Sequence, residues 1–236
     1  MVPASFAPFA FAGESLALGA SGAVWWPRAE ALLVADLHLE KASWYAQRGQ
    51  MLPPYDSRAT LERLARDSAA TGARRIVALG DSFHDRDGPS RLEAGAGALL
   101  ARIAETAGIL WVAGNHDAAS PADTAIGTCH GEITLHGIHL RHEAHPYESQ
   151  PEISGHFHPK IAVVARGRRI SRPCLLLTPN RIILPAYGAF TGGLSAHDPA
   201  IHASLGNAAP VEALLHVAGR IARFPAAPAA EKRRTG

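Results

Sequence analysis

The sequence has few cysteines, no long apolar run and little net charge, and each lack excludes a class of protein. Two cysteines, Cys129 and Cys174, are too few for a disulfide framework or a structural zinc site, so we expect two buried thiols in a reducing compartment. No apolar run is long enough to cross a bilayer, and residues 1–13 lack the basic start of a secretory signal. We therefore expect a cytoplasmic protein with no membrane partner. The net charge of +2 gives no general reason to expect a nucleic-acid partner.

The chain is long enough to bury one sizeable core, with 47% hydrophobic residues in a total of 236. Segments with structural periodicity run from about residue 14 to residue 224, and no linker long enough to divide them is present. We expect a single domain over 1–225. Residues 226–236, which are mainly alanine, proline and charged residues, are expected to form a disordered tail.

The first half of the chain repeats a strand–helix–strand pattern. Apolar runs at 31–35, 76–79 and 109–113 predict buried strands. Helical periodicity predicts helices over 57–71 and 90–107 between them. Polar residues follow each strand directly, and the carboxyl edge of such strands is where open α/β sheets build their sites.

The second half is predicted to consist mainly of short strands. Residues 133–135 and 138–140 flank His136-Gly137 as a hairpin, and the apolar residues after Pro210 predict a closing helix over 211–224. Further strands are expected at 16–18, 23–26, 161–165, around Ile170, at 175–177 and at 182–184.

Thirteen histidines are present, and histidine is the commonest metal ligand in proteins. Several of them fall in four clusters that also hold carboxylates or an amide, and three of these clusters follow predicted strands. The clusters are Asp36-Leu37-His38, Gly80-Asp81 with His84 and Asp85, Gly114-Asn115-His116-Asp117, and His142 with Gly155-His156-Phe157-His158. Because alternate residues of an extended chain point the same way, Asp36 and His38 are expected to face one ion.

Mixed carboxylate, amide and imidazole ligands suit divalent ions such as manganese, iron or zinc. Two such ions about 3.5–4 Å apart clamp the attacking and departing oxygens of an in-line displacement, and a metal-bound water ionised near neutral pH attacks phosphorus. Any one pair of these residues is a weak signal, because a single histidine is more often structural than a ligand. The four clusters together predict a two-metal phosphoesterase.

These clusters resemble the signature of the calcineurin-like metallophosphoesterases over roughly residues 32–158. The resemblance implies an α/β fold, a four-layer α-β-β-α sandwich, and two ion sites bridged by Asp81. It implies that His116 contacts the substrate phosphate and protonates or stabilises the leaving oxygen. The ligands implied for the first ion are Asp36, His38, Asp81 and His158, and those for the second are Asp81, Asn115, His142 and His156.

One position departs from the family pattern. Many members carry an aspartate three residues after the bridging aspartate, where it orients the catalytic histidine, but this sequence has His84 there and places the aspartate at Asp85. The partner of His116 is therefore open. His84 either touches the substrate or a metal, or packs beneath the loop. His84, His116 and Asp117 are the candidate catalytic residues.

Four stretches resemble a narrower group, the ligase-associated DNA-damage-response endonucleases (PdeM-type). They are Gly80-Asp81-Ser82-Phe83-His84-Asp85, Leu140-Arg141-His142-Glu143, Gly155-His156-Phe157-His158-Pro159, and the segment 184–193. This resemblance implies a manganese-dependent DNA phosphodiesterase in bacterial repair. It also implies a functional association with an ATP-dependent DNA ligase, a helicase and an exonuclease.

Residues 160–181 contain six basic and no acidic residues, and they begin two residues after the last proposed ligand. These cations either neutralise the backbone phosphates of a nucleic acid or protect the exposed edge of a hairpin. They are Lys160, Arg166, Arg168, Arg169, Arg172 and Arg181. Trp44 and Tyr45, soon after the first cluster, either stack on unpaired bases or serve as packing residues.

Three functions compete. The leading hypothesis is an endonuclease or phosphodiesterase acting on single-stranded DNA. A phosphatase or phosphodiesterase for a nucleotide or other small phosphate ester would use the same ions, so the fold and the ligands do not separate the two. A non-catalytic scaffold is disfavoured, because all seven ligand positions and His116 are present.

Overall fold

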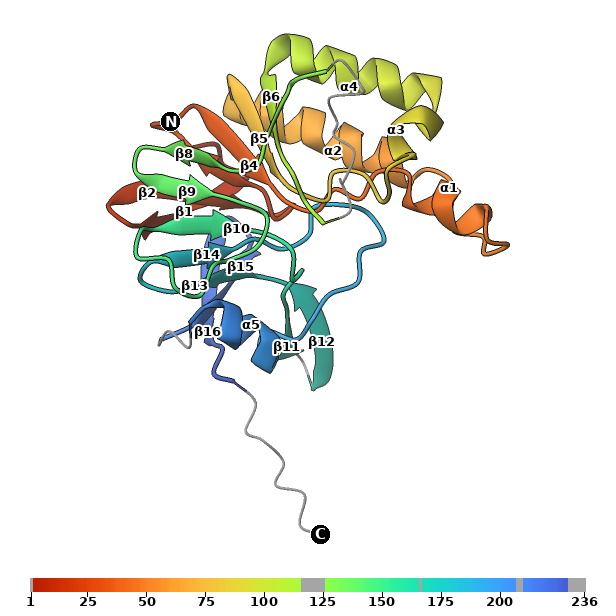
Figure 1. The fold of residues 1–236 in the computed structure, drawn as a ribbon. Helices are drawn as coiled ribbons and strands as arrows, with labels where there is room; N and C mark the ends of the chain where they lie inside the picture. The colour runs from red at the N-terminus through yellow and green to blue at the C-terminus, as the bar shows by residue number, and fades with distance from the viewer. Residues whose placement is uncertain (1, 116–125, 166, 207–209, 229–236) are drawn as a thin grey trace.

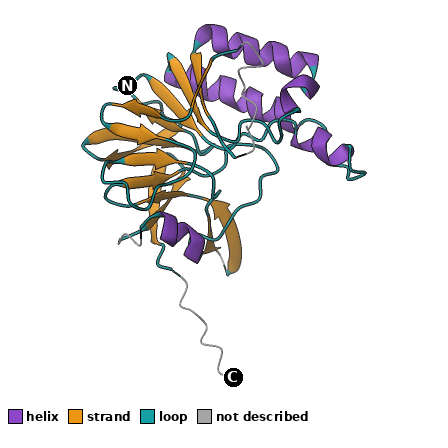
Figure 2. Cartoon of the chain, in the orientation of Figure 1, coloured by secondary structure: helices purple, strands orange, loops and turns teal. Residues whose placement is uncertain are grey.

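The computed structural model describes residues 2–115, 126–165, 167–206 and 210–228. Two seven-stranded sheets pack face to face, and helices cover the outer face of the first sheet (Figures 1 and 2). None of the helices within the described ranges is long and apolar enough to cross a membrane.

The first sheet contains the strands of the N-terminal half in chain order. They are β1 (Phe6–Phe11), β2 (Glu14–Gly19), β3 (Val24–Trp26), β4 (Ala31–Val34), β5 (Arg75–Leu79), β6 (Gly108–Val112) and β7 (Thr128–His130). Strands β1 to β4 are antiparallel, and β4 to β7 are parallel. The strands predicted at 31–35, 76–79 and 109–113 are confirmed. Strand β1 lies before the expected start of the structured region, and its Pro8 is tolerated because β1 is at the end of the sheet order, where one N–H is not needed.

The helices of this half are α1 (Lys41–Ala46), α2 (Asp56–Thr71), α3 (Gly88–Arg91) and α4 (Ala94–Thr106). Helix α2 buries Leu61 and Leu64 against the sheet, and α4 buries Leu100 beside them. The helix predicted over 90–107 is divided, because the extended ψ of 142° at Glu93 interrupts it. The Glu93 side chain then caps α4 by accepting hydrogen bonds from the backbone N–H groups of Gly95 and Ala96.

The second sheet has the order β16-β15-β13-β14-β10-β9-β8. Its strands are β8 (Ile133–Leu135), β9 (Ile138–Leu140), β10 (Glu152–Ser154), β13 (Leu175–Leu177), β14 (Arg181–Ile183), β15 (Glu212–Val217) and β16 (Arg220–Pro225). Strands β9, β10 and β14 are parallel. The predicted hairpin at His136-Gly137 is confirmed, with both residues at positive φ.

The prediction of a closing helix over 211–224 is wrong. Strands β15 and β16 form a hairpin there, and its two turn residues, Ala218 and Gly219, have φ of 47° and 79°. Leu214 faces the core between the two sheets, whereas Ala213 and Leu215 face the opposite side. A strand that is buried on both faces reads as a continuous apolar run, which periodicity does not distinguish from a helix.

The sandwich has four layers, as the resemblance implied. Trp26 and Leu33 of the first sheet share the central core with Ile153 of the second sheet and with Leu184, which follows β14. The outer face of the second sheet is covered by the hairpin of β11 (Lys160–Ala165) and β12 (Arg168–Pro173) together with α5 (Pro199–Ser204) (Figure 1). The fourth layer is therefore a hairpin and one short helix. Ala226, at the start of the predicted tail, is buried and donates its backbone N–H to Val211 O.

A buried ion network ties the parallel strands of the second sheet together. The Glu152 carboxylate in β10 is fully buried, lies 3.0 Å from Arg181 Nε and 3.3 Å from Arg141 Nη1, and accepts the backbone N–H of His145. Burial raises the pKa of Glu152, and the two arginines oppose that shift. Arg181 also donates to backbone carbonyl oxygens, those of His145, Pro146, Glu148 and Leu205.

We expect Arg181→Ala to lower the free energy of unfolding by about 3–5 kcal/mol, because it leaves the Glu152 carboxylate buried beside one less cation. Urea unfolding followed by circular dichroism measures the change. Arg168→Ala removes an exposed arginine from the neighbouring hairpin and is expected to change stability by less than about 0.5 kcal/mol. Equal effects of the two substitutions would contradict a structural role for Arg181.

The two thiols differ in exposure. Cys174 is buried, and burial raises the pKa of its thiol to about 12, whereas Cys129 is half-buried. Because the thiolate is the reacting form, Cys174 is expected to resist iodoacetamide at pH 8 in the native protein and to react after unfolding. Mass spectrometry of labelled peptides measures both sites. If iodoacetamide labels Cys174 in native Cys129→Ser protein, the Cys174 thiol is accessible in the folded state and the prediction is wrong.

Candidate metal centre

The candidate ligands converge because strands from both sheets end at one edge. Asp36 and His38 follow β4, Asp81 follows β5, and Asn115 follows β6. From the second sheet, His142 follows β9, and His156 and His158 follow β10. Residues as far apart in the sequence as Asp36 and His158 therefore meet at one place.

The first group consists of Asp36, His38 and His158, whose potential ligand atoms lie within 4.8 Å of one another. The Nε2 atoms of the two histidines are 3.3 Å apart, and His158 Nε2 lies 3.4 Å from Asp36 Oδ1. Asp36 is fully buried, and its carboxylate also accepts the backbone N–H of His156 at 3.0 Å. This hydrogen bond fixes the direction in which the Asp36 carboxylate points.

The second group consists of Asp81, His142 and His156. His142 Nε2 lies 3.5 Å from Asp81 Oδ2 and 3.0 Å from His156 Nδ1. Asn115 reaches the same place, with its Nδ2 3.4 Å from His156 Nδ1. The side chains expected around the second ion are therefore together.

Asp81 lies between the two groups. Its Oδ2 is 3.5 Å from His142 Nε2 and 4.0 Å from His38 Nε2, so one carboxylate faces a histidine of each group. Asp81 is 3% exposed. This geometry lets a single side chain contact two ions, as the bridging role requires.

The backbone at these ligands is unusual. Five of them have φ in the left-handed region, which non-glycine residues rarely adopt and which is found at functional sites. They are Asp36 (54°), His38 (44°), Asp81 (46°), His156 (75°) and His158 (47°). Asp36 and His38 belong to one group as expected, but simple extended alternation is not the reason.

Two glycines allow the strand ends to approach. Gly80 has φ of +77°, and a β-carbon there would overlap the His142 ring. A β-carbon at Gly114 would overlap the backbone nitrogen and the carboxylate of Asp81. The glycines that precede Asp81 and Asn115 are therefore steric requirements of the site.

Hydrogen bonding and burial prepare the histidines to bind a cation. His142 Nδ1 donates to the carbonyl oxygen of Leu79 at 3.0 Å, which leaves the lone pair of Nε2 directed at Asp81 and His156. Burial lowers the pKa of His156, and the nearby His142 lowers it further. A neutral imidazole is the form that ligates metal. Carboxylates and imidazoles in this arrangement fit two divalent cations of hard or borderline character.

His84 is half-buried beside the first group. Its ring lies 5.6 Å from that of His38, 4.8 Å from that of Trp44 and 5.9 Å from that of Tyr45, measured between centroids. Trp44 and Tyr45 therefore pack on His84 at the border of the site, and base stacking by them stays a prediction. His116, Asp117 and Arg166 lie outside the described residues.

Asp85, the displaced aspartate, forms a two-pronged ion pair with Arg91, whose Nη2 lies 2.5 Å from Asp85 Oδ1. Arg91 also donates to Ser43 Oγ and so connects the loop after β5 to α1. Through Arg91, Asp85 therefore fixes the loop that carries His84 against α1.

The described basic residues of 160–181 do not form one continuous surface. Arg168, Arg169 and Arg172 are exposed on β12, where Arg169 and Arg172 line hollows on opposite faces of the hairpin. The inclusion of Arg181 was wrong, because Arg181 is buried in the network with Glu152. Sequence reasoning also missed Glu143, whose Oε1 lies 3.9 Å from His156 Nε2; its position next to His142 was the available signal.

A four-layer sandwich with paired aspartate–histidine groups where its two sheets converge defines a metal-dependent phosphoesterase. The chain belongs to the metallophosphoesterase family, a class of hydrolases. The crystal structure of Pseudomonas putida nuclease MPE is 32% identical, with a TM-score of 0.70, over 93% of this chain and 100% of that chain. The phosphoesterase Yfce from E. coli matches with 14% identity and a TM-score of 0.39 over 83% of this chain and 98% of that one, a likeness too low to bear on function. No family model and no curated protein matches the chain.

We expect Gly80→Ala to reduce metal binding, because the added β-carbon displaces the His142 ring. After manganese is added and the excess removed, elemental analysis should show less metal per chain than in the wild type. Gly97→Ala in α4 is the matched control, since the added carbon meets nothing closer than 4.0 Å. Wild-type metal content in Gly80→Ala would show that His142 is dispensable or relocates.

Proposed function

We propose that this metallophosphoesterase is a manganese-dependent endonuclease that cleaves single-stranded DNA in a bacterial repair pathway in the cytoplasm. The observation that carries the chemistry is the position of the Asp81 carboxylate between His38 and His142, with a candidate ligand group on either side. The similarity to a protein whose name describes it as a nuclease supports the choice of substrate. A functional association with an ATP-dependent DNA ligase, a helicase and an exonuclease is part of the proposal.

Two divalent cations bound here would polarise the phosphoryl oxygens and supply an ionised water as the nucleophile. Asp36, His38 and His158 would hold one cation and Asn115, His142 and His156 the other, with Asp81 a shared ligand. The oxygen of the attacking water forms a bond to phosphorus as the ester P–O bond on the opposite side breaks. His116 would protonate or stabilise the departing oxygen, in the role that the family resemblance implies.

The arrangement of charge near the site favours a polyanion over a small ester. Lys160 begins β11 two residues after His158, and its Nζ donates to Thr191 O. Lys41, three residues after His38, is half-buried; burial lowers its pKa, Asp56 opposes that shift, and Lys160 adds to it. Both lysines lie close in sequence to residues of the first ligand group and can contact phosphates that flank the scissile one. A small phosphate ester as the substrate is the alternative.

The decisive substitution is Asp81→Ala. With manganese restored to metal-stripped protein, the wild type is expected to linearise circular single-stranded DNA, which has no ends for an exonuclease. Asp81→Ala is expected to reduce the rate by more than about 100-fold, because losing only a group that hydrogen-bonds to a metal ligand already costs about 10–100-fold. Gel electrophoresis separates circles from linear products.

A phosphomonoester and a small phosphodiester are tested in parallel. An intact circle together with rapid, Asp81-dependent hydrolysis of a small ester would reject the DNA substrate and keep the two-metal chemistry. A cleavage rate that falls with salt for DNA, but not for the small ester, would support the polyanion.

His116→Ala tests the assignment of the leaving-group residue. We expect this protein to retain two manganese ions per chain and to lose at least about 100-fold in cleavage rate, the contribution typical of general acid catalysis. Elemental analysis and the circle assay measure the two quantities separately. Loss of metal from His116→Ala would show that the residue is a ligand instead.

A further inference from the structure

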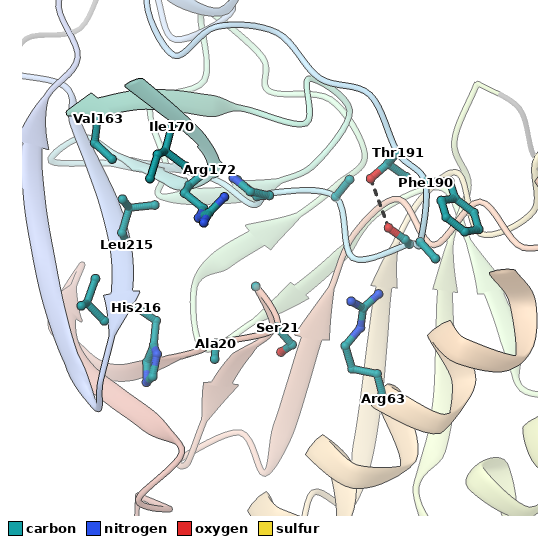
Figure 3. A pocket seen from close by; sticks show the side chains of 16 residues that line it. Ala20, Ser21, Arg63, Val163, Ile170, Arg172, Phe190, Thr191, Leu215 and His216 are labelled. Carbon is teal, nitrogen blue, oxygen red and sulfur yellow. Dashed lines mark hydrogen bonds between the residues drawn. The ribbon is translucent and has the colours of Figure 1, made fainter. Parts of the chain in front are cut away.

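A cavity of about 600 Å³ lies further along the sandwich edge that carries the metal centre (Figure 3). Its walls come from the turn between β2 and β3, the β11–β12 hairpin, the end of β15 and the loop 186–191. These segments lie at the same edge as the metal centre. The β2–β3 turn neighbours the end of β4. The end of β15 neighbours the start of β13, which pairs with the end of β14, the parallel neighbour of β10.

The loop 186–191 connects the cavity to the metal centre. Gly188 lines the cavity and donates its backbone N–H to Asp36 O at 3.1 Å, and Tyr187 donates its own to Ala35 O. Space for a β-carbon at Gly188 is taken by the carbonyl group of Leu37. The wall of the cavity is therefore built directly on the strand end that presents the first ligand.

Two arginines line the cavity, and neither forms an ion pair within the described residues. Arg63 stacks on the Tyr187 ring at 4.6 Å and donates to Tyr187 O, and Arg172 extends from β12 (Figure 3). No described carboxylate lies within ion-pair distance of either arginine, and none of the lining residues is acidic. Nε2 of His216 is buried, so the donors that a ligand in the cavity can reach are the two guanidinium groups. Such a set of donors suits an anion.

The remaining walls are apolar. Ile170 of β12 and Leu215 of β15 lie on one side, and Phe190, which is 47% exposed, lies on the other (Figure 3). The volume is within the range of about 300–1,000 Å³ that small-molecule sites occupy. Cationic donors beside aliphatic and aromatic surface fit a ligand with a phosphate at one end and a planar base at the other.

We propose that this cavity binds a nucleoside monophosphate unit, with its phosphate at Arg172 on one side and its base against Phe190, beside Arg63, on the other. The unit is one nucleotide of the strand held at the metal centre, reached over the loop 186–191. This second statement rests on the proposed function, whereas the binding of the nucleotide itself does not.

The test uses the full chain with metal removed by a chelator, so that the metal centre does not compete for phosphate. Binding of deoxyadenosine monophosphate is measured by titration calorimetry, and binding of a labelled single-stranded 15-mer is measured by fluorescence anisotropy. Arg172→Gln removes a cation from the cavity, and Ala20→Trp fills the cavity from an exposed position on its wall. Arg169→Gln is the matched control, because it makes the same change on the opposite face of β12.

We expect Arg172→Gln and Ala20→Trp each to weaken binding of both ligands by at least about fivefold, the scale of one charge-assisted contact. Arg169→Gln should leave mononucleotide affinity within about twofold. Affinity for the 15-mer declines as salt rises. In Arg172→Gln, the slope of log affinity against log salt should become less negative by about 0.7, the value for one phosphate of a single strand.

Two results would overturn the proposal in different ways. Equal effects of Arg169→Gln and Arg172→Gln, with none from Ala20→Trp, would mean that diffuse charge on the hairpin attracts the ligand and that the cavity is not its site. Weaker mononucleotide binding with unchanged 15-mer binding would place a free nucleotide in the cavity and reject its place on the strand path. Because no cleavage is measured, either result is independent of the circle assay.

Discussion

A single buried carboxylate holds the two halves of this site in one arrangement. The Asp81 side chain leaves the end of β5 and faces His38 from the neighbouring strand end and His142 from the other sheet. That position is possible because Gly114 leaves room beside Asp81 and Gly80 leaves room for the His142 ring. The pairing of the two sheets therefore has to place the ends of β4, β5, β6, β9 and β10 within a few ångströms of each other.

This arrangement raises the free energy of the folded state, and the rest of the fold has to offset that increase. Buried carboxylates and five left-handed ligand residues are costly in the absence of bound cations. The core between the sheets supplies the opposing free energy through closely packed apolar side chains. The Glu152–Arg181 pair adds a local restraint, since it joins β10, which precedes His156, to β14.

The ligands themselves do not distinguish a nuclease from an enzyme for small esters, because both reactions stabilise the same developing charge on phosphorus. Specificity is decided by what surrounds the ions. Here the same edge carries two half-buried lysines, Lys41 and Lys160, and a cavity lined by two arginines. The loop 186–191 connects them, so the binding of a neighbouring nucleotide and the position of Asp36 share one piece of backbone.

The sequence by itself determined the candidate ligand types, their order and their positions after strands, because these are local patterns of a few residues each. Composition and periodicity also located both long helices. Only the tertiary structure decided that 211–224 is a hairpin buried on both faces, and that Arg181 belongs to a buried ion pair while Arg172 faces a cavity. It likewise brought Arg63 and His216, which are 153 residues apart, to one cavity. These outcomes depend on which distant segments pack together, and a local pattern holds no information about the partner that a side chain meets.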